Sequence, residues 1–372
     1  METKALIFIP TLTVGGAERV ASILANSWCE YAETSVTVLL MFDDEIFFPV
    51  NPRVRVRRLG LTPRLGVVAR VMAVARALFV FRRIVKEESP DFVLSFMNKY
   101  NVFCLASLLG TGIPTIISER GSPTEANREL NWRFRQLFYP LSCGIITQTE
   151  DSKLHLTKRI GHTNITVVYN PIRISRNCTM GVRRQRFVLN VGRLVPVKGQ
   201  ADLLHAFAKA DVAEWELVIC GDGPLRDALE VRARRLGLNG RIRFMGMVKD
   251  VSGWYARAGV FAFPSYSEGF PNALAEAMVC GVPTVSYDCS MGPSELIEHG
   301  VNGYLVKVGD IEQMARHLRD LMTDSAMRER FSCHAAGVAD KLDATKIAKR
   351  YFEFCTTSVV RHRKQHGLCS QS

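Results

Sequence analysis

The chain has 372 residues, of which 47% are hydrophobic and 23% are charged, and its formal net charge is +12. These values are ordinary for a globular enzyme of two domains, and the basic excess calls for an anionic partner. No apolar stretch of about 18 residues lacks charge, so we expect no membrane span. Residues 5–9 are too short for the core of a signal peptide. The ten cysteines show no Cys-x-x-Cys pair and no zinc-like spacing, and as free thiols they indicate a reducing compartment.

The first half of the chain predicts alternating strands and helices. We expect strands at 4–10, 35–42, 92–96 and 115–118, and helices at 16–31, 65–86 and 102–109. The strands are continuously apolar and are separated by helices. This pattern indicates a parallel sheet covered on both faces.

The polar and basic segment 171–186 reads as a linker, after which the same pattern begins again. We expect strands at 187–191, 216–220, 242–245, 260–262 and 284–287, helices at 200–209 and 225–236, and a last helix at 344–355. The predicted fold is α/β, with two doubly wound domains facing each other across a cleft. Ligands of such sheets bind beyond the carboxyl ends of the strands. The predicted segments are a first domain at 1–172, a linker at 173–186, a second domain at 187–343, a terminal helix at 344–358 and a disordered basic tail at 359–372.

Residues 261–280 carry the most informative pattern: an apolar strand, a turn and a helix that begins at Pro271. The first-turn amides of such a helix form an anion site suited to phosphate. They belong to Asn272, Ala273 and Leu274. The carboxylates of Glu268 and Glu276 would repel phosphate, but they can accept hydrogen bonds from sugar hydroxyls on either side of it. The segment therefore predicts a nucleotide-sugar site, although a plain turn glutamate and a dipole-stabilised helix glutamate remain alternatives.

Further motifs lie in one order along about 290 residues. They are Gly15-Gly16-Ala17-Glu18-Arg19, Asn190-Val191-Gly192-Arg193-Leu194 with Lys198-Gly199, Gly221-Asp222-Gly223-Pro224, Gly246 after a strand, Glu268 and Glu276 eight positions apart, and Gly303-Tyr304-Leu305-Val306. In this order they resemble the retaining glycosyltransferases of the GT-B architecture, in particular family 4. The resemblance implies two Rossmann-like domains and a terminal helix that crosses back to brace the first one.

The resemblance also implies roles for the motif residues. Arg193 and Lys198 would hold the donor's diphosphate and neutralise the leaving group, unless they are ordinary solvated surface cations. Glu268 would contact the transferred sugar and Glu276 the ribose. The Gly15-Gly16 turn lacks the Gly-x-Gly-x-x-Gly spacing of dinucleotide sites, so we expect it to close over the donor from the opposite domain. The remaining expected donor contacts are Asp222, Gly246, Val248, Gly269 and Phe270.

Residue 120 departs from the family pattern, because many relatives have a histidine there that contacts the transferred sugar. Arg120 is a candidate catalytic residue that could reach phosphate instead, or it could form a structural salt bridge with Glu119. The chain has no Asp-x-Asp pair of the kind that binds a diphosphate-bound metal. We therefore expect catalysis without a metal and without a cofactor.

Residues 53–86 contain ten basic and no acidic residues. The helix expected at 65–86 has one apolar stripe suited to core packing and a second strip that a core helix does not need. The cations expected to make a functional contact lie at the two ends of this helix and are Arg64, Arg82, Arg83 and Lys86. They could contact an anionic membrane surface or an acceptor's pyrophosphate, or they could simply be solvated.

The resulting hypothesis is a retaining glycosyltransferase of bacterial surface-glycan biosynthesis. It would move a hexose or N-acetylhexosamine from a nucleotide sugar, with UDP favoured, to a glycolipid or lipid-linked oligosaccharide at the cytoplasmic face of the membrane. A nucleotide-sugar epimerase or hydrolase and a non-catalytic nucleotide-sugar binding protein are the alternatives. Nucleic acid is disfavoured as a partner, because the chain has no recognition helix, RNP-like strand or finger spacing.

Overall fold

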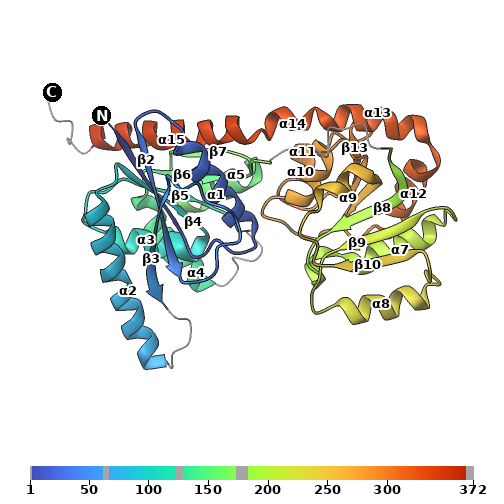
Figure 1. Cartoon of the computed structure of the whole chain (residues 1–372), viewed down its shortest axis with the longest axis horizontal. Coiled ribbons are helices and arrows are strands. Elements are labelled where there is room, and N and C mark those ends of the chain that lie inside the picture. Colours follow the sequence, from blue (N-terminus) through green and yellow to red (C-terminus); the bar gives the residue numbers. More distant parts are fainter. Residues whose placement is uncertain (1, 62–66, 122–128, 173–182, 366–372) are drawn as a thin grey trace. The chain divides into compact units, whose positions relative to one another are not determined.

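A computed structural model describes residues 2–61, 67–121, 129–172 and 183–365. The chain divides into two compact units. Unit 1 comprises Met1–Pro171 and Ala344–Ser372, and unit 2 comprises Ile172–Asp343 (Figure 1). The C-terminal helix therefore belongs to the unit formed by the N-terminal half of the chain.

Unit 1 contains a parallel sheet whose described strands have the order β3-β2-β1-β4-β5-β6-β7. The strands are β1 (Thr3–Ile9), β2 (Thr34–Phe42), β3 (Arg55–Leu61), β4 (Phe92–Phe96), β5 (Thr115–Ser118), β6 (Gly144–Thr147) and β7 (Ile165–Val167). The helices are α1 (Gly16–Trp28), α2 (Val67–Glu88), α3 (Asn98–Leu108), α4 (Glu129–Phe138), the 3-10 turn η1 (Tyr139–Leu141), α5 (Glu150–Ile160) and α15 (Ala344–Gln365).

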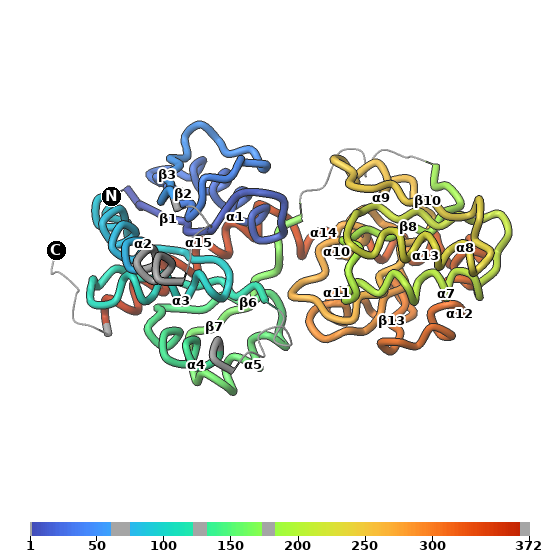
Figure 2. The backbone as a smooth tube through the Cα atoms, turned by 90° about the horizontal axis from the view of Figure 1, so that it is seen from below, coloured from blue at the N-terminus to red at the C-terminus, as the bar shows by residue number. Residues whose placement is uncertain are grey.

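Helices cover both faces of this sheet, and β1 shows why its sequence is continuously apolar. Its residues Ala5, Ile7 and Ile9 pack in a core that contains α1 and α15. Leu6 and Phe8 pack on the opposite face in a core that contains α2 and α3. Trp28 of α1 donates a hydrogen bond from Nε1 to the carbonyl oxygen of residue 348, at 2.9 Å, so that α15 lies beside α1 (Figure 2).

Unit 2 contains a second parallel sheet, with described strands in the order β10-β9-β8-β11-β12-β13. The strands are β8 (Gln185–Val191), β9 (Glu216–Cys220), β10 (Ile242–Gly246), β11 (Ala258–Phe263), β12 (Thr284–Tyr287) and β13 (Gly303–Val306). The helices are η2 (Pro196–Lys198, 3-10), α7 (Gln200–Ala210), α8 (Arg226–Arg235), α9 (Ser252–Arg257), α10 (Asn272–Val279), α11 (Pro293–Leu296), α12 (Ile311–Thr323), α13 (Ser325–Ala336) and α14 (Val338–Lys341).

The strand order reverses once in each sheet, between β1 and β4 in unit 1 and between β8 and β11 in unit 2. Connections leave in opposite directions at these switch points, which opens a crevice at the carboxyl ends of the two strands. The predicted α/β class with two doubly wound parallel sheets is confirmed. The glycine motifs after β1 and β8 both lie at a switch point.

Three expectations are corrected. The strand β3 and the elements between residues 129 and 167 were not anticipated, because β3 is an edge strand rich in arginine and the other elements are short. The tail expected from residue 359 is helical as far as Gln365, because Val359 is buried and Arg363 pairs with Asp91 at 3.1 Å. Seven described cysteines are free, but Cys280 is disulfide-bonded, so the expectation of free thiols is wrong there. None of the described helices combines the length and apolar character that crossing a membrane requires.

Candidate active site

The switch point of unit 2 brings the end of β8 against the end of β11. After Gly192 and Arg193 the chain forms η2, and Gly199 then begins α7 with a left-handed φ of 65°. A Cβ on Gly199 would lie 2.0 Å from the carbonyl oxygen of Pro264, so only glycine permits this approach. The amide of Tyr266 donates to the carbonyl oxygen of Val197 at 2.8 Å and joins the two loops.

This approach places two predicted site residues in contact. Lys198 Nζ lies 2.6 Å from Glu268 Oε1, and their side chains are 22% and 10% exposed. The pair is therefore largely shielded from water. A lysine held beside a carboxylate offers a cation for phosphate next to an acceptor for a sugar hydroxyl.

The start of α10 differs from the prediction by one residue. Pro271 is the N-cap and Asn272 is the first helical residue. The amide of Asn272 donates to the carbonyl oxygen of Phe270 at 2.9 Å, so the expectation of a free amide at this position is wrong. The amides of Ala273 and Leu274 lie in the first turn, where a helix offers no internal acceptor. Gly269 and Glu276 are half-buried on either side of this turn.

Arg193, the second predicted cation, is exposed. Its backbone is fixed, because Gln200 donates from Nε2 to its carbonyl oxygen at 3.1 Å. The position of the backbone is thus determined by α7, while the side chain is accessible from solvent. The exposed side chain fits both expectations for Arg193, a diphosphate contact and a solvated surface cation.

The loops after β9 and β10 join the same edge of the sheet. The amide of Gly221 donates to the carbonyl oxygen of Gly246 at 2.8 Å, and the amide of Leu194 donates to that of Asp222 at 2.9 Å. The Asp222 carboxylate accepts from the amide of Gly223 at 2.7 Å. Val248 is half-buried beyond this loop. The predicted nucleoside contacts thus lie on loops bonded to the one that carries Arg193.

Sequence reasoning missed a carboxylate that fixes the loop after β11. The hydroxyls of Tyr266 and Tyr287 both donate to Asp202 Oδ2, at 2.7 and 2.9 Å. Asp202 lies in the first turn of α7, three residues after Gly199. Cys289 was also missed, and its pKa is raised to about 12 by burial and by the charge of Glu268. Nothing in the linear order of these residues indicates that they meet.

At the switch point of unit 1, Gly15 precedes α1 in an extended conformation. A Cβ on Gly15 would lie 2.1 Å from Glu18 Oε2, so the Glu18 carboxylate folds back over the glycine turn. Burial raises the pKa of Glu18, against an opposing effect from the charge of Arg120. A buried carboxylate at a switch point is a functional candidate. The sequence signal was available, since Glu18 is the acidic residue of the Gly15–Arg19 motif.

Arg120, a predicted catalytic residue, is held by the protein itself. Its Nε donates to Ser118 Oγ at 3.0 Å and its Nη2 to the Tyr351 hydroxyl at 2.8 Å, while Nη1 donates to Asn170 Oδ1. The guanidinium also lies 4.9 Å from the centre of the Phe96 ring. All three nitrogens are engaged, so the geometry favours a structural tie between β5 and α15 over contact with a sugar.

The suggested Glu119–Arg120 pair is wrong, because Glu119 bonds elsewhere. Its Oε2 lies 3.1 Å from Arg135 Nη2 and accepts from the Tyr139 hydroxyl at 2.6 Å. The two charged side chains are 3% and 4% exposed. This ion pair is part of the core of unit 1.

The predicted membrane or acceptor cations lie near the end of α2, apart from Arg64, which falls outside the described residues. Arg82 donates to the carbonyl oxygen of Leu109 at 2.9 Å, and Arg83 pairs with Glu87 at 3.3 Å. Lys86 is exposed. Leu109 precedes β5, so these cations lie toward the amino ends of the strands, opposite the glycine motif.

Two family models match consecutive parts of the chain. The model described as Glycosyltransferase Family 4 matches residues 14–176, and the model described as Glycosyl transferases group 1 matches residues 181–337. The chain is a GT-B glycosyltransferase of the family 4 type. The first match begins after β1 and includes the Gly15–Arg19 motif, and the second includes all six described strands of the unit 2 sheet.

Curated relatives of this family 4 glycosyltransferase align over most of their length. It is 28% identical over 332 residues to an α-1,4-N-acetyl-D-galactosaminyltransferase of Campylobacter jejuni that is named for its PP-undecaprenol-linked glycan substrate, covering 88% of the chain and 90% of the relative. It is also 28% identical over 339 residues to the amylovoran biosynthesis glycosyltransferase AmsD of Erwinia amylovora, covering 88% and 93%.

Solved structures share the fold of this glycosyltransferase at low sequence identity. Sucrose-phosphate synthase of Thermosynechococcus elongatus superimposes with a TM-score of 0.82 at 15% identity, covering 96% of the chain and 99% of that structure. Anabaena HepE in complex with UDP-glucose superimposes with a TM-score of 0.76 at 21% identity, covering 96% and 100%. These likenesses establish the GT-B architecture.

Proposed function

We propose that the protein transfers a hexose or N-acetylhexosamine, with retention of anomeric configuration, from a nucleotide sugar to a membrane-associated glycolipid or lipid-linked oligosaccharide. UDP is the favoured nucleotide, and bacterial surface-glycan biosynthesis at the inner face of the cytoplasmic membrane is the favoured setting. Two features support this: the construction of the unit 2 site, and the names of the relatives, which include a transferase named for a PP-undecaprenol-linked substrate and a glycosyltransferase of amylovoran biosynthesis.

The observation that carries the proposal is the Lys198–Glu268 contact of 2.6 Å at the switch point of unit 2. A diphosphate can bind Lys198, Arg193 and the first-turn amides of α10. Glu268 then lies where the transferred sugar leaves the phosphate, and Glu276, one turn into α10, is assigned to the ribose. A nucleotide sugar needs this order of sugar, phosphate and ribose groups.

The proposed reaction needs no general base from the protein. The acceptor oxygen forms a bond to the anomeric carbon as the bond from that carbon to the diphosphate oxygen breaks. The electron pair leaves on the diphosphate, which also takes the acceptor's proton. Arg193 and Lys198 stabilise the negative charge that develops there. We propose that these cations make a divalent metal unnecessary, so EDTA should leave the rate unchanged.

The position of the α2 cations favours a membrane surface over the acceptor's diphosphate as their partner. Arg82, Arg83 and Lys86 lie toward the amino ends of the strands, whereas the glycine motif of unit 1 follows the carboxyl end of β1. A group bound at the reacting centre is therefore remote from them. Phe79 of α2 is 68% exposed one turn before Arg82, and an apolar side chain beside cations suits a lipid headgroup layer.

The function is tested in two steps. Thermal-shift measurements with UDP, GDP and ADP should show the largest stabilisation with UDP, since a ligand that binds the folded state raises Tm. Incubation of the best UDP-sugar with a lipid-linked acceptor should give a glycoside of the donor's anomeric configuration by NMR. Sugar or nucleotide release at the same rate without acceptor would instead identify a hydrolase or epimerase, and binding with no turnover would identify a non-catalytic protein.

A further inference from the structure

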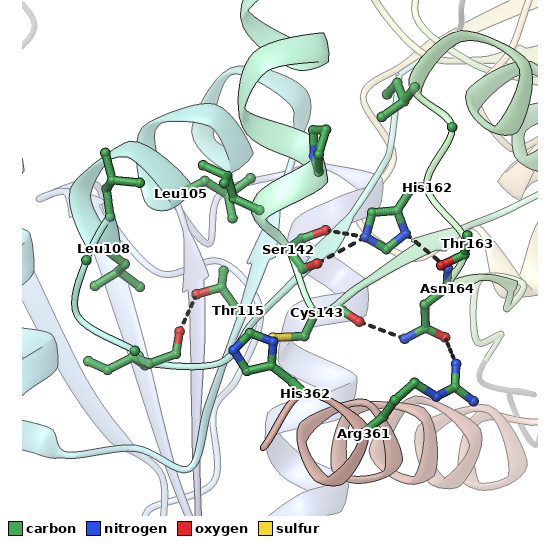
Figure 3. A pocket seen from close by; sticks show the side chains of 18 residues that line it. Leu105, Leu108, Thr115, Ser142, Cys143, His162, Thr163, Asn164, Arg361 and His362 are labelled. Atoms are coloured by element: carbon green, nitrogen blue, oxygen red, sulfur yellow. Dashed lines mark hydrogen bonds between the residues drawn. The ribbon is translucent and has the colours of Figure 1, made fainter. Parts of the chain in front are cut away.

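Unit 1 contains a pocket of about 610 Å³ that the proposed reaction does not use. It lies at the amino ends of β5, β6 and β7, where Thr115, Cys143 and Asn164 line it (Figure 3). The Gly15 motif lies beyond the carboxyl end of β1 in the same parallel sheet. The pocket is therefore separate from the switch point of unit 1.

One side of the pocket is apolar. It is formed by the end of α3, the turn after α4 and the end of α5, with Leu105, Leu108, Ile113, Leu141 and Ile160 among the lining residues. Leu109 also lines it and is 56% exposed, and Leu141 is 47% exposed. Large apolar side chains exposed at the edge of a pocket are suited to contact with an apolar partner.

The other side is basic and comes from α15, which supplies Arg361 and His362 (Figure 3). Arg361 Nη1 donates to Asn164 Oδ1 at 3.1 Å, and Asn164 Nδ2 donates to Ser358 Oγ at 2.9 Å. These bonds fix the exposed guanidinium beside the pocket. Lys158, Arg159 and Lys364 are exposed on the neighbouring turns of α5 and α15. None of the lining residues, all within the described part of the chain, is acidic.

His162, in contrast, is structural. Its Nδ1 accepts from the amide of Asn164 at 3.1 Å, so its Nε2 carries the proton and donates to the carbonyl oxygen of Ser142 at 3.0 Å. Both ring nitrogens are used, and the cationic side of the pocket is formed by α15.

The basic end of α2 is continuous with this surface, because Arg82 donates a hydrogen bond to the backbone carbonyl of Leu109, which lines the pocket.

We propose that this pocket binds an anionic membrane lipid, with the phosphate at Arg361 and His362 and the start of an acyl chain along the apolar wall. The pocket has a basic side, an apolar wall and no acidic side chain among the described residues that line it. A ligand that matches both sides is negatively charged at one end and apolar at the other. The inference extends the proposed membrane association and rests on it. It gives that association a defined site at the edge of unit 1 opposite the glycine motif.

The test is a titration of the full chain with monomeric dihexanoyl phosphatidylglycerol, followed by NMR or calorimetry. The pocket predicts saturable one-to-one binding, with the zwitterionic phosphatidylcholine analogue weaker by about tenfold. Arg361→Glu should weaken binding by about tenfold or more, whereas Arg235→Glu, at an exposed arginine of unit 2, should not. Equal losses in both variants, or no saturable binding, would overturn the proposal.

A second variant separates the pocket from a general basic surface. Leu141→Trp fills the entrance but keeps every cation, so it should abolish binding of the monomeric lipid while binding to anionic vesicles persists. Unchanged monomer binding by this variant would contradict the pocket. Full displacement of the lipid by an equal concentration of inorganic phosphate would show that free phosphate is the ligand. The titration contains no nucleotide, so its outcome is independent of the UDP thermal shift. Lipid binding can be absent while UDP raises Tm, and UDP can fail to raise Tm while the lipid binds.

Discussion

The two units have the same doubly wound architecture but use the charged residues after their strands differently. In unit 2, Lys198 and Glu268 pair at 2.6 Å and are partly accessible. In unit 1, Glu119 pairs with Arg135 inside the core. Arg120, like Glu119, follows strand β5, and its three side-chain nitrogens are bonded to protein groups.

This difference shows that a charge after a strand does not by itself mark a ligand site. The Lys198–Glu268 pair is more exposed than the Glu119–Arg135 pair, and Lys198 has fewer protein partners than Arg120. Lys198 has three donor hydrogens and one carboxylate partner close by. Arg120 uses three of its five N–H donors on protein groups, and breaking these bonds for a ligand would cost their hydrogen-bond energy. The comparison leads to four predictions.

The largest expected effect is on stability, in unit 1. Glu119→Ala leaves the buried Arg135 without its partner and should reduce the free energy of unfolding by about 3–5 kcal/mol. Glu216→Gln, in an exposed pair with Arg243 at 3.0 Å, should change it by less than about 1 kcal/mol. Denaturant unfolding of both variants measures the difference. Similar small losses would show that the Glu119 pair is not a core element.

The second effect is on activity, in unit 2. Lys198→Met should lower kcat/KM about 100-fold to 1,000-fold, because it removes a group that stabilises the leaving diphosphate. The variant also leaves the Glu268 carboxylate, whose side chain is 10% exposed, without its cation, so some loss of stability is expected and the kinetics are measured at a temperature at which the variant is folded. Lys209→Met removes a surface partner of Glu312 and is the matched control. Steady-state kinetics with a UDP-sugar give kcat/KM for both variants. Equal values would contradict the assignment of Lys198 to the leaving diphosphate.

A third prediction concerns the approach of η2 to β11. Gly199→Ala introduces a Cβ at a φ of 65° and against Pro264, and should cost about 1–3 kcal/mol of stability. Gly237→Ala shares the left-handed φ, at 70°, but meets no atom within 4 Å. It should therefore cost only the strain, about 1–2 kcal/mol. Equal unfolding midpoints for the two variants would mean that the Pro264 contact is unimportant.

The smallest effect depends on pH. Burial raises the pKa of Glu18 above its ordinary value of 4.5, so the folded protein binds this proton more tightly than the unfolded chain. Stability is therefore lost as pH rises from 4.5 through the folded-state pKa. Glu18→Gln should raise Tm at pH 7, and the gain should disappear below pH 4.5. Melting curves of the variant and the wild-type protein between pH 4.5 and 7 measure this difference in Tm. A difference in Tm that grows as the pH falls would contradict a raised pKa of Glu18 in the folded state.

Much of the fold was accessible from the sequence, because buried parallel strands are continuous apolar runs. Strands β4, β5, β9 and β12 have the predicted bounds for this reason. The arginine-rich edge strand β3 has no such run and was missed. The helical continuation to Gln365 brings Arg363 beside Asp91, which is distant in sequence.

The candidate site was predicted where local motifs define it and missed where tertiary contacts do. Gly199, Lys198 and Glu268 belong to motifs that also fix the backbone, so their proximity could be anticipated. The role of Asp202 depends on two tyrosines from separate loops. The engagement of Arg120 depends on Tyr351 from the far end of the chain. Such pairings have no signature in a single sequence.

The central claim is that the switch point of unit 2 binds the diphosphate of a nucleotide sugar. Calorimetric titration of UDP into the wild-type chain and into the Arg193→Ala/Lys198→Ala double variant tests it directly. We predict one saturable site in the wild-type protein and binding weaker by at least about 100-fold in the double variant, because two charge-assisted contacts are lost. Equal affinity of the two proteins for UDP would contradict the account.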